Sequence, residues 1–329
     1  MREANNTASV KALRVAAIQM TSRLGMVEEN IGHATRMIED AAGQGAKMVV
    51  LPEMCMTGYT LTKQAWDMAE PAGGPIEQWL TSTSKRLGIY LGAGLVGCEG
   101  EDFYNTYLLA DPQGKAIGRV RKTQTEYDIF KAGDMASHVI DTDIGRIGVG
   151  ICADNHVVFL PKLMEEKGVD ILLMPHAWPT PYRTSKLISE QDIKEQNDNA
   201  HEYALLFSMI LGIPVVFVNQ AGPIEGGRWP GILGRVLTPE YFRYPGLSAI
   251  VDSDKSIKAQ TGHDEGIIVA DVTMDPARKH KAEIPDYGGW LHPGAFPMRK
   301  IVMPLEIYRG KISYKLSGER KRKALACNG

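Results

Sequence analysis

Residues 147–154 read Ile-Gly-Val-Gly-Ile-Cys-Ala-Asp. An apolar, β-branched run with two glycines, followed by an amphipathic segment, predicts a strand that turns sharply into a helix. The turn carries one thiol, Cys152, at its tip. A thiol at the positive end of a helix is favoured as the thiolate. The stretch therefore predicts a reactive cysteine at the end of a buried strand.

Two other apolar strands also end in a side chain that can take part in catalysis. The segment 47–51 leads through a proline to Glu53, and the segment 116–120 leads to Lys122. A glutamate, a lysine and a cysteine at the ends of separate strands form one cluster if those strands share a sheet.

Composition bounds the class of protein. The chain has 329 residues, enough for a substantial core in one large domain or two ordinary ones. Its 37 Lys and Arg residues nearly balance its 39 Asp and Glu residues, so the net charge is −2. No overall charge attracts nucleic acid or an anionic membrane, and a small molecule is the expected partner.

The cysteines and the apolar stretches predict a compartment. Four cysteines lie far apart in the chain: Cys55, Cys98, Cys152 and Cys327. This spacing predicts no disulfide framework and no metal-binding Cys-x-x-Cys pair, which suits a reducing cytosol. Residues 1–11 predict a flexible polar tail without the apolar segment of a signal peptide. The apolar stretch 204–218 is too short to span a membrane, so we expect a soluble, cytoplasmic protein.

Strand and helix patterns alternate in the first half of the chain, and hairpins follow. Helices are expected at 27–42, 75–87, 157–167 and 190–211. Strands are expected at 13–20, 47–51, 89–96, 104–110, 116–120, 147–151, 169–174, 214–219 and 266–272. This order favours one α/β domain at 12–275, with helices outside the sheet. The long aromatic loop 222–245 is a candidate pocket wall.

The ordered motifs resemble those of the nitrilase superfamily of carbon–nitrogen hydrolases. The matching stretches are Leu-Pro-Glu at 51–53 with Thr-Gly-Tyr at 57–59, Arg-Lys-Thr at 121–123 and Gly-Ile-Cys-Ala-Asp at 150–154. Shorter flanking pieces fit at 15–19, 104–106, 218–219 and 246–250, so the likeness covers about 13–275. The resemblance implies a four-layer α-β-β-α sandwich that extends across a homodimer or larger homo-oligomer. The C-terminal extension 276–329, in which Trp290, Phe296, Ile301 and Leu305 are spread along the chain, would cross to the partner.

The resemblance also implies a catalytic cluster that needs no cofactor and no metal. Cys152 would be the nucleophile, and Glu53 the base that takes its proton. Lys122 and a backbone N–H after Cys152 would stabilise the oxyanion before a thioester forms and is hydrolysed. A second glutamate, which positions substrate and lysine in many members, matches Glu126, with Asp128 as the alternative.

Departures from the family pattern bear on the substrate. Relatives that cleave N-carbamoyl amino acids or dicarboxylic half-amides commonly place arginine shortly after the cysteine, where this chain has Asn155 and His156. Nitrilases often continue Cys-Trp-Glu, where this chain reads Cys-Ala-Asp. Both departures favour a neutral amide, aliphatic or aromatic. The expected pocket residues are Tyr59, Ala153, Asn155, His156, His176 and Trp178, although each histidine could equally be a packed histidine.

Other functions stay open at this point. The same cluster could hydrolyse a nitrile or an N-carbamoyl amide, and a protein of this fold could be an inactive scaffold. Residues 148–153 also mimic the Gly-x-Gly-x-x-Ala of a dinucleotide site, with Asp170 downstream, which would suggest an oxidoreductase. The basic run 320–323 is typical of a solvated tail.

Overall fold

The computed structural model describes residues 10–186, 188–226, 239–280, 283–293 and 298–329. Most of the predicted tail, Phe296 and the middle of the 222–245 loop lie outside these ranges. The predicted tail ends one residue too late, because Lys11 already pairs with Met274 in a sheet. No helix within the described ranges is long and apolar enough to cross a membrane.

The first sheet has six strands and a parallel centre. Its order is β15 (Gly266–Met274), β1 (Lys11–Gln19), β2 (Met48–Val50), β3 (Tyr90–Glu99), β4 (Asp102–Ala110) and β5 (Ala116–Arg121). Strands β1, β2 and β3 are parallel, and β4 and β5 continue the sheet as antiparallel neighbours. The C-terminal ends of β2 and β5 therefore lie at the same edge of this sheet.

The second sheet repeats this plan with another parallel centre. Its order is β14 (Ile257–Gln260), β13 (Ala249–Val251), β10 (Val215–Asn219), β8 (Ile171–His176), β7 (Gly145–Val149) and β6 (Val139–Thr142). Strands β7, β8 and β10 are parallel. A small third sheet comprises β11 (Ala221–Pro223), β12 (Phe242–Pro245) and β9 (Thr180–Pro181).

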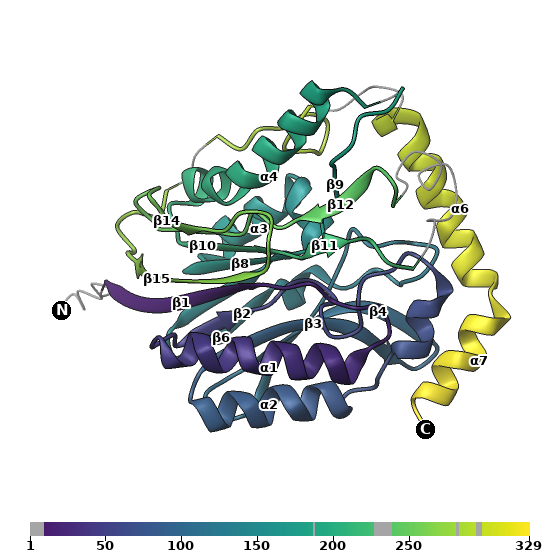
Figure 1. Ribbon diagram of the computed structural model, residues 1–329, viewed down its shortest axis with the longest axis horizontal. Helices are drawn as coiled ribbons and strands as arrows, with labels where there is room; N and C mark the ends of the chain where they lie inside the picture. Colours follow the sequence, from purple (N-terminus) through teal and green to yellow (C-terminus); the bar gives the residue numbers. More distant parts are fainter. Residues whose placement is uncertain (1–9, 187, 227–238, 281–282, 294–297) are drawn as a thin grey trace, which may run out of the picture.

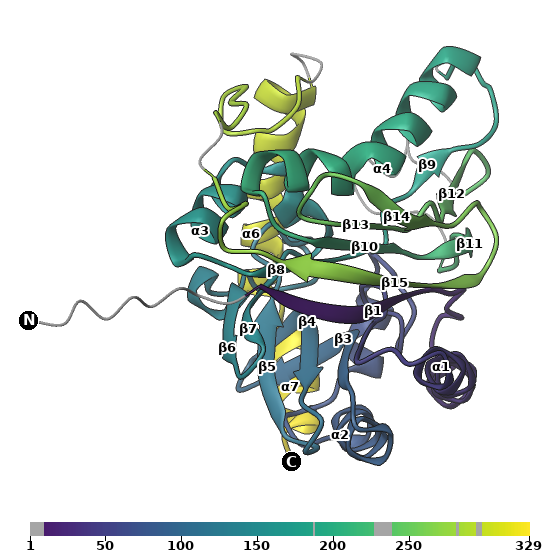
Figure 2. The same cartoon turned by 90° about the vertical axis from the view of Figure 1, so that its left-hand side faces the viewer.

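Helices cover both outer faces of the sandwich, as Figures 1 and 2 show. Helices α1 (Val27–Gly43) and α2 (Pro75–Leu87) pack on the first sheet, and α3 (Phe159–Lys167) and α4 (Glu190–Leu211) pack on the second. A separate apolar cluster fills the space between the sheets. The four layers match the predicted α-β-β-α sandwich, and the sequence-expected helices agree with these bounds within about two residues.

Local sequence explains where the helices begin and end. Helix α2 starts with Pro75 in its first turn and ends at Gly88, which adopts the left-handed conformation. Helix α4 starts with a capping box in which Ser189 and Asp192 bond each other's backbone N–H, and it ends at the left-handed Gly212. These signals are readable in the sequence.

The C-terminal segment differs from the sequence expectation. It shows little apolar periodicity, yet it forms α6 (Met303–Leu316) and α7 (Gly318–Cys327), which run along one edge of the molecule in Figure 1. The basic run 320–323 is not simply a solvated tail, because Arg320 is buried and pairs with Asp102 at 2.6 Å. These helices pack on their own chain, and a crossing to a partner subunit stays a prediction.

The spacing of the cysteines predicted no disulfide framework, but one disulfide is present. Cys98 at the end of β3 and Cys327 at the end of α7 form a disulfide, while Cys55 and Cys152 are free and buried. The two partners are 229 residues apart in sequence. Spacing along the chain could not reveal the pair, because only the docking of α7 beside β3 brings the two sulfurs together.

Candidate active site

Glu53 lies in the buried turn that follows β2. Its carboxylate is fully buried, accepts hydrogen bonds from Asn105 Nδ2 at 2.8 Å and from the Ala177 backbone N–H at 2.8 Å, and contacts Lys122. The turn passes so close to β3 that a Cβ on Gly94 would collide with the Met54 backbone nitrogen. Close packing of the turn therefore fixes the direction of the Glu53 side chain.

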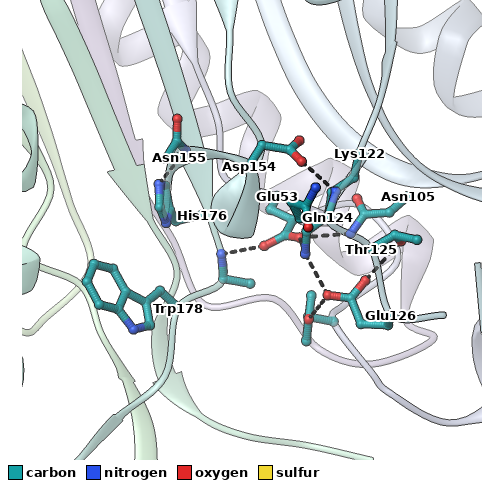
Figure 3. Close-up of polar contacts among 12 residues, drawn as sticks. Glu53, Asn105, Lys122, Gln124, Thr125, Glu126, Asp154, Asn155, His176 and Trp178 are labelled. Atoms are coloured by element: carbon teal, nitrogen blue, oxygen red, sulfur yellow. Dashed lines mark hydrogen bonds and ion pairs between the residues drawn. The ribbon is translucent and has the colours of Figure 1, made fainter. Parts of the chain in front are cut away.

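Lys122 follows β5 and is held between two carboxylates. Its ammonium Nζ lies 2.7 Å from Glu53 Oε1 and 2.6 Å from Glu126 Oε1. The Tyr59 hydroxyl donates a second hydrogen bond to the same Glu126 oxygen, at 2.7 Å. Figure 3 shows Lys122 between the two glutamates. The structure thus brings Glu126 to the lysine, whereas Asp128 pairs with Arg309 at 2.7 Å.

Asp154 joins the lysine loop to the cysteine turn. Its Oδ1 accepts hydrogen bonds from the Thr123 backbone N–H, the Thr123 hydroxyl and the Gln124 backbone N–H, at 3.0, 2.6 and 2.7 Å. Because Asp154 is two residues after Cys152 and Thr123 directly follows Lys122, these bonds set the distance between ammonium and thiol. The sequence motif includes Asp154, but only the structure shows what it does.

Cys152 stands at the turn between β7 and a short 3₁₀ helix, Cys152–His156, that precedes α3. Its backbone is left-handed, with φ 46°, which costs a non-glycine residue roughly 1 kcal/mol or more and is typical of functional sites. A Cβ on Gly150 would collide with the Asn155 side chain, so the turn needs glycine there. The predicted strand-to-helix turn is present.

The electrostatics of the cluster assign protons to its members. Burial, and then the charge of Glu53, raise the pKa of Cys152 well above its usual range, against the opposing effects of Lys122 and the Ala177 N–H. The expected stabilisation of a thiolate by a helix end is therefore overridden, and the resting sulfur is a neutral thiol. The Ala177 N–H acts on both the sulfur and the Glu53 carboxylate, so the thiol and the carboxylate share one site.

The two carboxylates respond differently to the same lysine. Burial raises the pKa of Glu53 above 4.5, and the attraction of Lys122 only partly offsets it. Burial also tends to raise the pKa of Glu126. This effect is outweighed by the charge and hydrogen bond of Lys122 and by the hydrogen bond from the Tyr59 hydroxyl, so the pKa of Glu126 is lowered. Burial alone would lower the pKa of Lys122, yet the two glutamates together raise it well above 10.5. At neutral pH the lysine is an ammonium and Glu126 a carboxylate.

Comparison with known proteins identifies the family. The family model for carbon–nitrogen hydrolases matches residues 14–282. This chain belongs to the carbon–nitrogen hydrolase family. It is 32% identical over 270 residues to an omega-amidase of Xenopus tropicalis, covering 78% of this chain and 87% of that protein. It is 30% identical over 176 residues to a nitrilase of Pyrococcus abyssi, covering 52% of this chain and 67% of that protein.

The fold is shared as well. A carbon–nitrogen hydrolase from Helicobacter pylori superposes with a TM-score of 0.69 at 19% identity, over 81% of this chain and 90% of that one. Several other omega-amidases are matched over 45 to 58% of their own length, so the chain spans about half of those relatives. The family membership and the carbon–nitrogen hydrolase class are thus established.

Not every expected pocket residue of this carbon–nitrogen hydrolase lines a pocket. Asn155 and His176 are fully buried and hydrogen-bond each other at 2.8 Å, and Asn155 also donates to the Gly150 carbonyl. Burial and the neighbouring His156 lower the pKa of His176 well below 6.5, so it is neutral. Figure 3 shows Asn155, His176 and Trp178 on the side of Glu53 away from Glu126. Asn155 and His176 therefore brace the turn that carries the cysteine.

The remaining expected pocket residues divide into two groups. His156 and Trp178 are half-buried and pack edge to face, with ring centroids 4.7 Å apart, and the Tyr203 hydroxyl contacts His156 Nδ1 at 2.7 Å. Tyr59 contacts the Glu126 carboxylate, and Ala153 lines a cavity. Of the six expected pocket residues, Ala153 lines this cavity, whereas Tyr59 is buried against the catalytic cluster.

Four residues near the cluster were not identified as site residues from the sequence. Asn105 and the Ala177 N–H hold the Glu53 carboxylate, and the Gln220 side chain donates to the Glu53 carbonyl at 2.7 Å. Tyr244 lies edge-on to Tyr59, and its buried hydroxyl has no hydrogen-bond partner among the residues that the structure describes. Asn105 lies within the matching stretch 104–106 and Gln220 directly follows the stretch 218–219, whereas Ala177 acts through its backbone and Tyr244 lies in β12, where the sequence carries no chemical signal.

A cavity of about 290 Å³ opens beside Glu126. Helix α6 and the loop after Lys122 form its walls, and Ala153 reaches it from the cysteine turn. Within the described ranges, no group of three or more His, Cys, Asp or Glu side chains is arranged to hold a metal ion.

Proposed function

We propose that this protein is a cysteine-dependent amidase that hydrolyses a small neutral amide through a thioester on Cys152. The observation that carries the proposal is the buried ammonium of Lys122 between two carboxylates, with a neutral thiol in electrostatic contact with the cluster. A neutral thiol is a poor nucleophile, and a carboxylate with a raised pKa is a suitable base for it.

The first half-reaction forms the thioester. Glu53 takes the Cys152 thiol proton while the sulfur bonds to the amide carbon, and the carbonyl π electrons move to oxygen. The Lys122 ammonium and the Ala153 backbone N–H stabilise that oxyanion. The intermediate collapses as the C–N bond breaks, and the protonated Glu53 gives its proton to the leaving nitrogen. Ammonia or an amine departs.

The second half-reaction restores the enzyme. Glu53 removes a proton from water, and the resulting hydroxide attacks the thioester carbon. The C–S bond breaks, the sulfur recovers a proton from Glu53, and the carboxylic acid leaves. Glu126 reacts with nothing in this scheme, because its low pKa and its bonds to Lys122 and Tyr59 suit it to holding the ammonium in place.

A neutral substrate fits the surroundings better than an acidic one. Among described residues that line the cavity, none is lysine or arginine. A carboxylate-bearing substrate would lack a fixed cation, which argues against N-carbamoyl amino acids. Nitrile hydrolysis by the same cluster is the second candidate, favoured by the 30% identity to the Pyrococcus nitrilase.

The decisive experiment measures ammonia release from matched amide and nitrile panels, combined with intact-protein mass spectrometry. The wild type is expected to turn over amides faster than nitriles and to carry a transient adduct of acyl mass on Cys152. Cys152→Ala should reduce turnover by at least roughly 10⁴-fold while leaving the fold intact.

Cys55→Ala is the matched control. Cys55 is also buried, and burial raises its pKa to about 12, but it faces the Gly94 carbonyl rather than the lysine. Its loss should leave turnover within about threefold of wild type. Near-normal activity in Cys152→Ala, or an acyl adduct on another residue, would refute the mechanism. An absence of adduct and turnover with every amide and nitrile would favour an inactive scaffold.

A further inference from the structure

The cavity beside Glu126 is lined by chain neighbours of the proposed reacting groups. Gln124, Thr125 and Glu126 line one end, two to four residues beyond Lys122, and Ala153 is the residue after Cys152. Its volume, about 290 Å³, is at the small end of the range for ligand sites. Ala153 and Glu126 therefore connect the catalytic cluster to this space.

Much of the cavity wall is apolar. The apolar side chains that form it are Leu61, Ile129, Trp290, Met303 and Ile307. The other two carboxylates of the lining share one cation, because Arg309 Nη2 lies 2.7 Å from both Asp128 Oδ2 and Glu306 Oε2, so this end of the cavity offers no free positive charge to an anionic substrate. The chemistry of the wall therefore favours a hydrocarbon group over a charged one.

Helix α6 supplies part of this wall and is fixed against the catalytic loop. A Cβ on Gly310 would lie 3.0 Å from the Asp128 backbone nitrogen, so the helix rests directly on the loop that follows Lys122. The Tyr314 hydroxyl accepts a hydrogen bond from the Phe103 N–H at 2.9 Å, and Arg309 adds its pair with Asp128. These contacts hold Met303 and Ile307 at a fixed distance from Glu126.

We propose that this cavity is the acyl-group site and that α6 limits the length of the acyl chain. The inference rests on the proposed amidase function and names its substrate class: primary amides of uncharged, apolar monocarboxylic acids of medium length. Recognition comes from burial of methylene groups against Ile129, Met303 and Ile307. The C-terminal extension is then part of the substrate site of its own chain.

The test is a chain-length series of acetamide, butyramide, hexanamide and octanamide, with the half-amide of glutaric acid as the charged comparison. In the wild type, kcat/KM should rise roughly fourfold per added methylene until the cavity is full. The value of kcat/KM for the charged half-amide should be at least about tenfold lower than that for an uncharged amide of similar length. Ile307→Trp should lower the hexanamide-to-acetamide ratio of kcat/KM at least about tenfold. Ile307→Ala should move the optimum to a longer chain.

Leu305→Trp is the matched control, because Leu305 is an exposed residue of the same helix outside the cavity lining. Its hexanamide-to-acetamide ratio should stay within about twofold of wild type. Circular dichroism checks that the variants fold. Stabilisation of Cys152→Ala by hexanamide in a thermal-shift assay, and its loss in Cys152→Ala/Ile307→Trp, would support the site without any turnover.

Two outcomes would overturn the inference. One is a flat chain-length profile, and the other is an unchanged ratio in Ile307→Trp. Cys152-dependent acetamide hydrolysis would then leave the proposed function standing. If no amide is turned over, the proposed function fails, and the thermal-shift comparison still decides whether the cavity binds apolar amides.

Discussion

Removing the Cys98–Cys327 disulfide tests the docking of the C-terminal helices. The bond closes a loop with a sequence separation of 229. It lowers the conformational entropy of the unfolded chain, which for a loop of this length stabilises the folded state by about 5 kcal/mol. Unfolding entropy of about 2 cal/mol/K per residue, over 329 residues, gives about 0.7 kcal/mol/K in total. Cys327→Ser is therefore expected to lower Tm by about 7 °C.

Activity should change far less than stability. The buried Arg320 still pairs with Asp102, and Tyr314 still bonds the Phe103 N–H, so α6 and α7 stay docked below Tm. Amide turnover by Cys327→Ser at 25 °C is expected within about twofold of wild type. Scanning calorimetry with and without dithiothreitol measures the stability, and the reductant should lower Tm of wild type but not of the variant.

A thiol count and a mutant cycle supply the controls. Wild type unfolded in denaturant without reductant should expose two thiols, those of Cys55 and Cys152. Cys98→Ser/Cys327→Ser should lose barely more stability than Cys98→Ser alone, because either change breaks the same bond. Four free thiols, or additive losses in the double variant, would show that the reasoning about this bond is wrong.

Two further predictions concern the reacting groups. The rate at which iodoacetamide alkylates Cys152 and the value of kcat/KM should both rise as the pH passes the pKa of Glu53, because the base must be ionised. Burial raises that pKa above 4.5. Rates that have already reached their plateau at pH 4 would contradict this order of protonation. Neither rate should fall on the basic side below about pH 9, because Lys122 stays protonated there. Its pKa is well above 10.5, since the charges of the two glutamates outweigh the effect of burial. Asp154→Ala removes three hydrogen bonds to the loop after Lys122 and should lower kcat about 100-fold with little change in KM. It should also lower Tm, because buried donors lose their acceptor. Asp154→Asn, which keeps an acceptor, should recover at least part of the loss in kcat. Equal kcat values for the two variants would mean that Asp154 does not position the lysine.

Much of the fold and the core of the candidate site could be predicted from the sequence. Apolar periodicity located the main strands and helices, because burial of one helix face or of a whole parallel strand leaves a regular pattern. Glu53, Lys122 and Cys152 stand directly after such strands, so their placement at strand ends follows from local sequence alone. Their convergence needed the further fact that parallel strands of both sheets present these ends at one edge.

The remaining features depend on contacts between distant parts of the chain. The choice of Glu126 over Asp128 is decided by α6, whose Arg309 pairs with Asp128, and the disulfide of Cys98 by the docking of α7.

The sequence by itself determined which side chains can react and the order in which the strands present them, since these are properties of local patterns. Only the tertiary structure decided that the Cys152 thiol is neutral, that Asn155 braces a turn instead of lining a pocket, and that α6 forms part of the cavity wall. The physical reason is that burial, charge coupling and packing act between residues that are close in space but far apart along the chain.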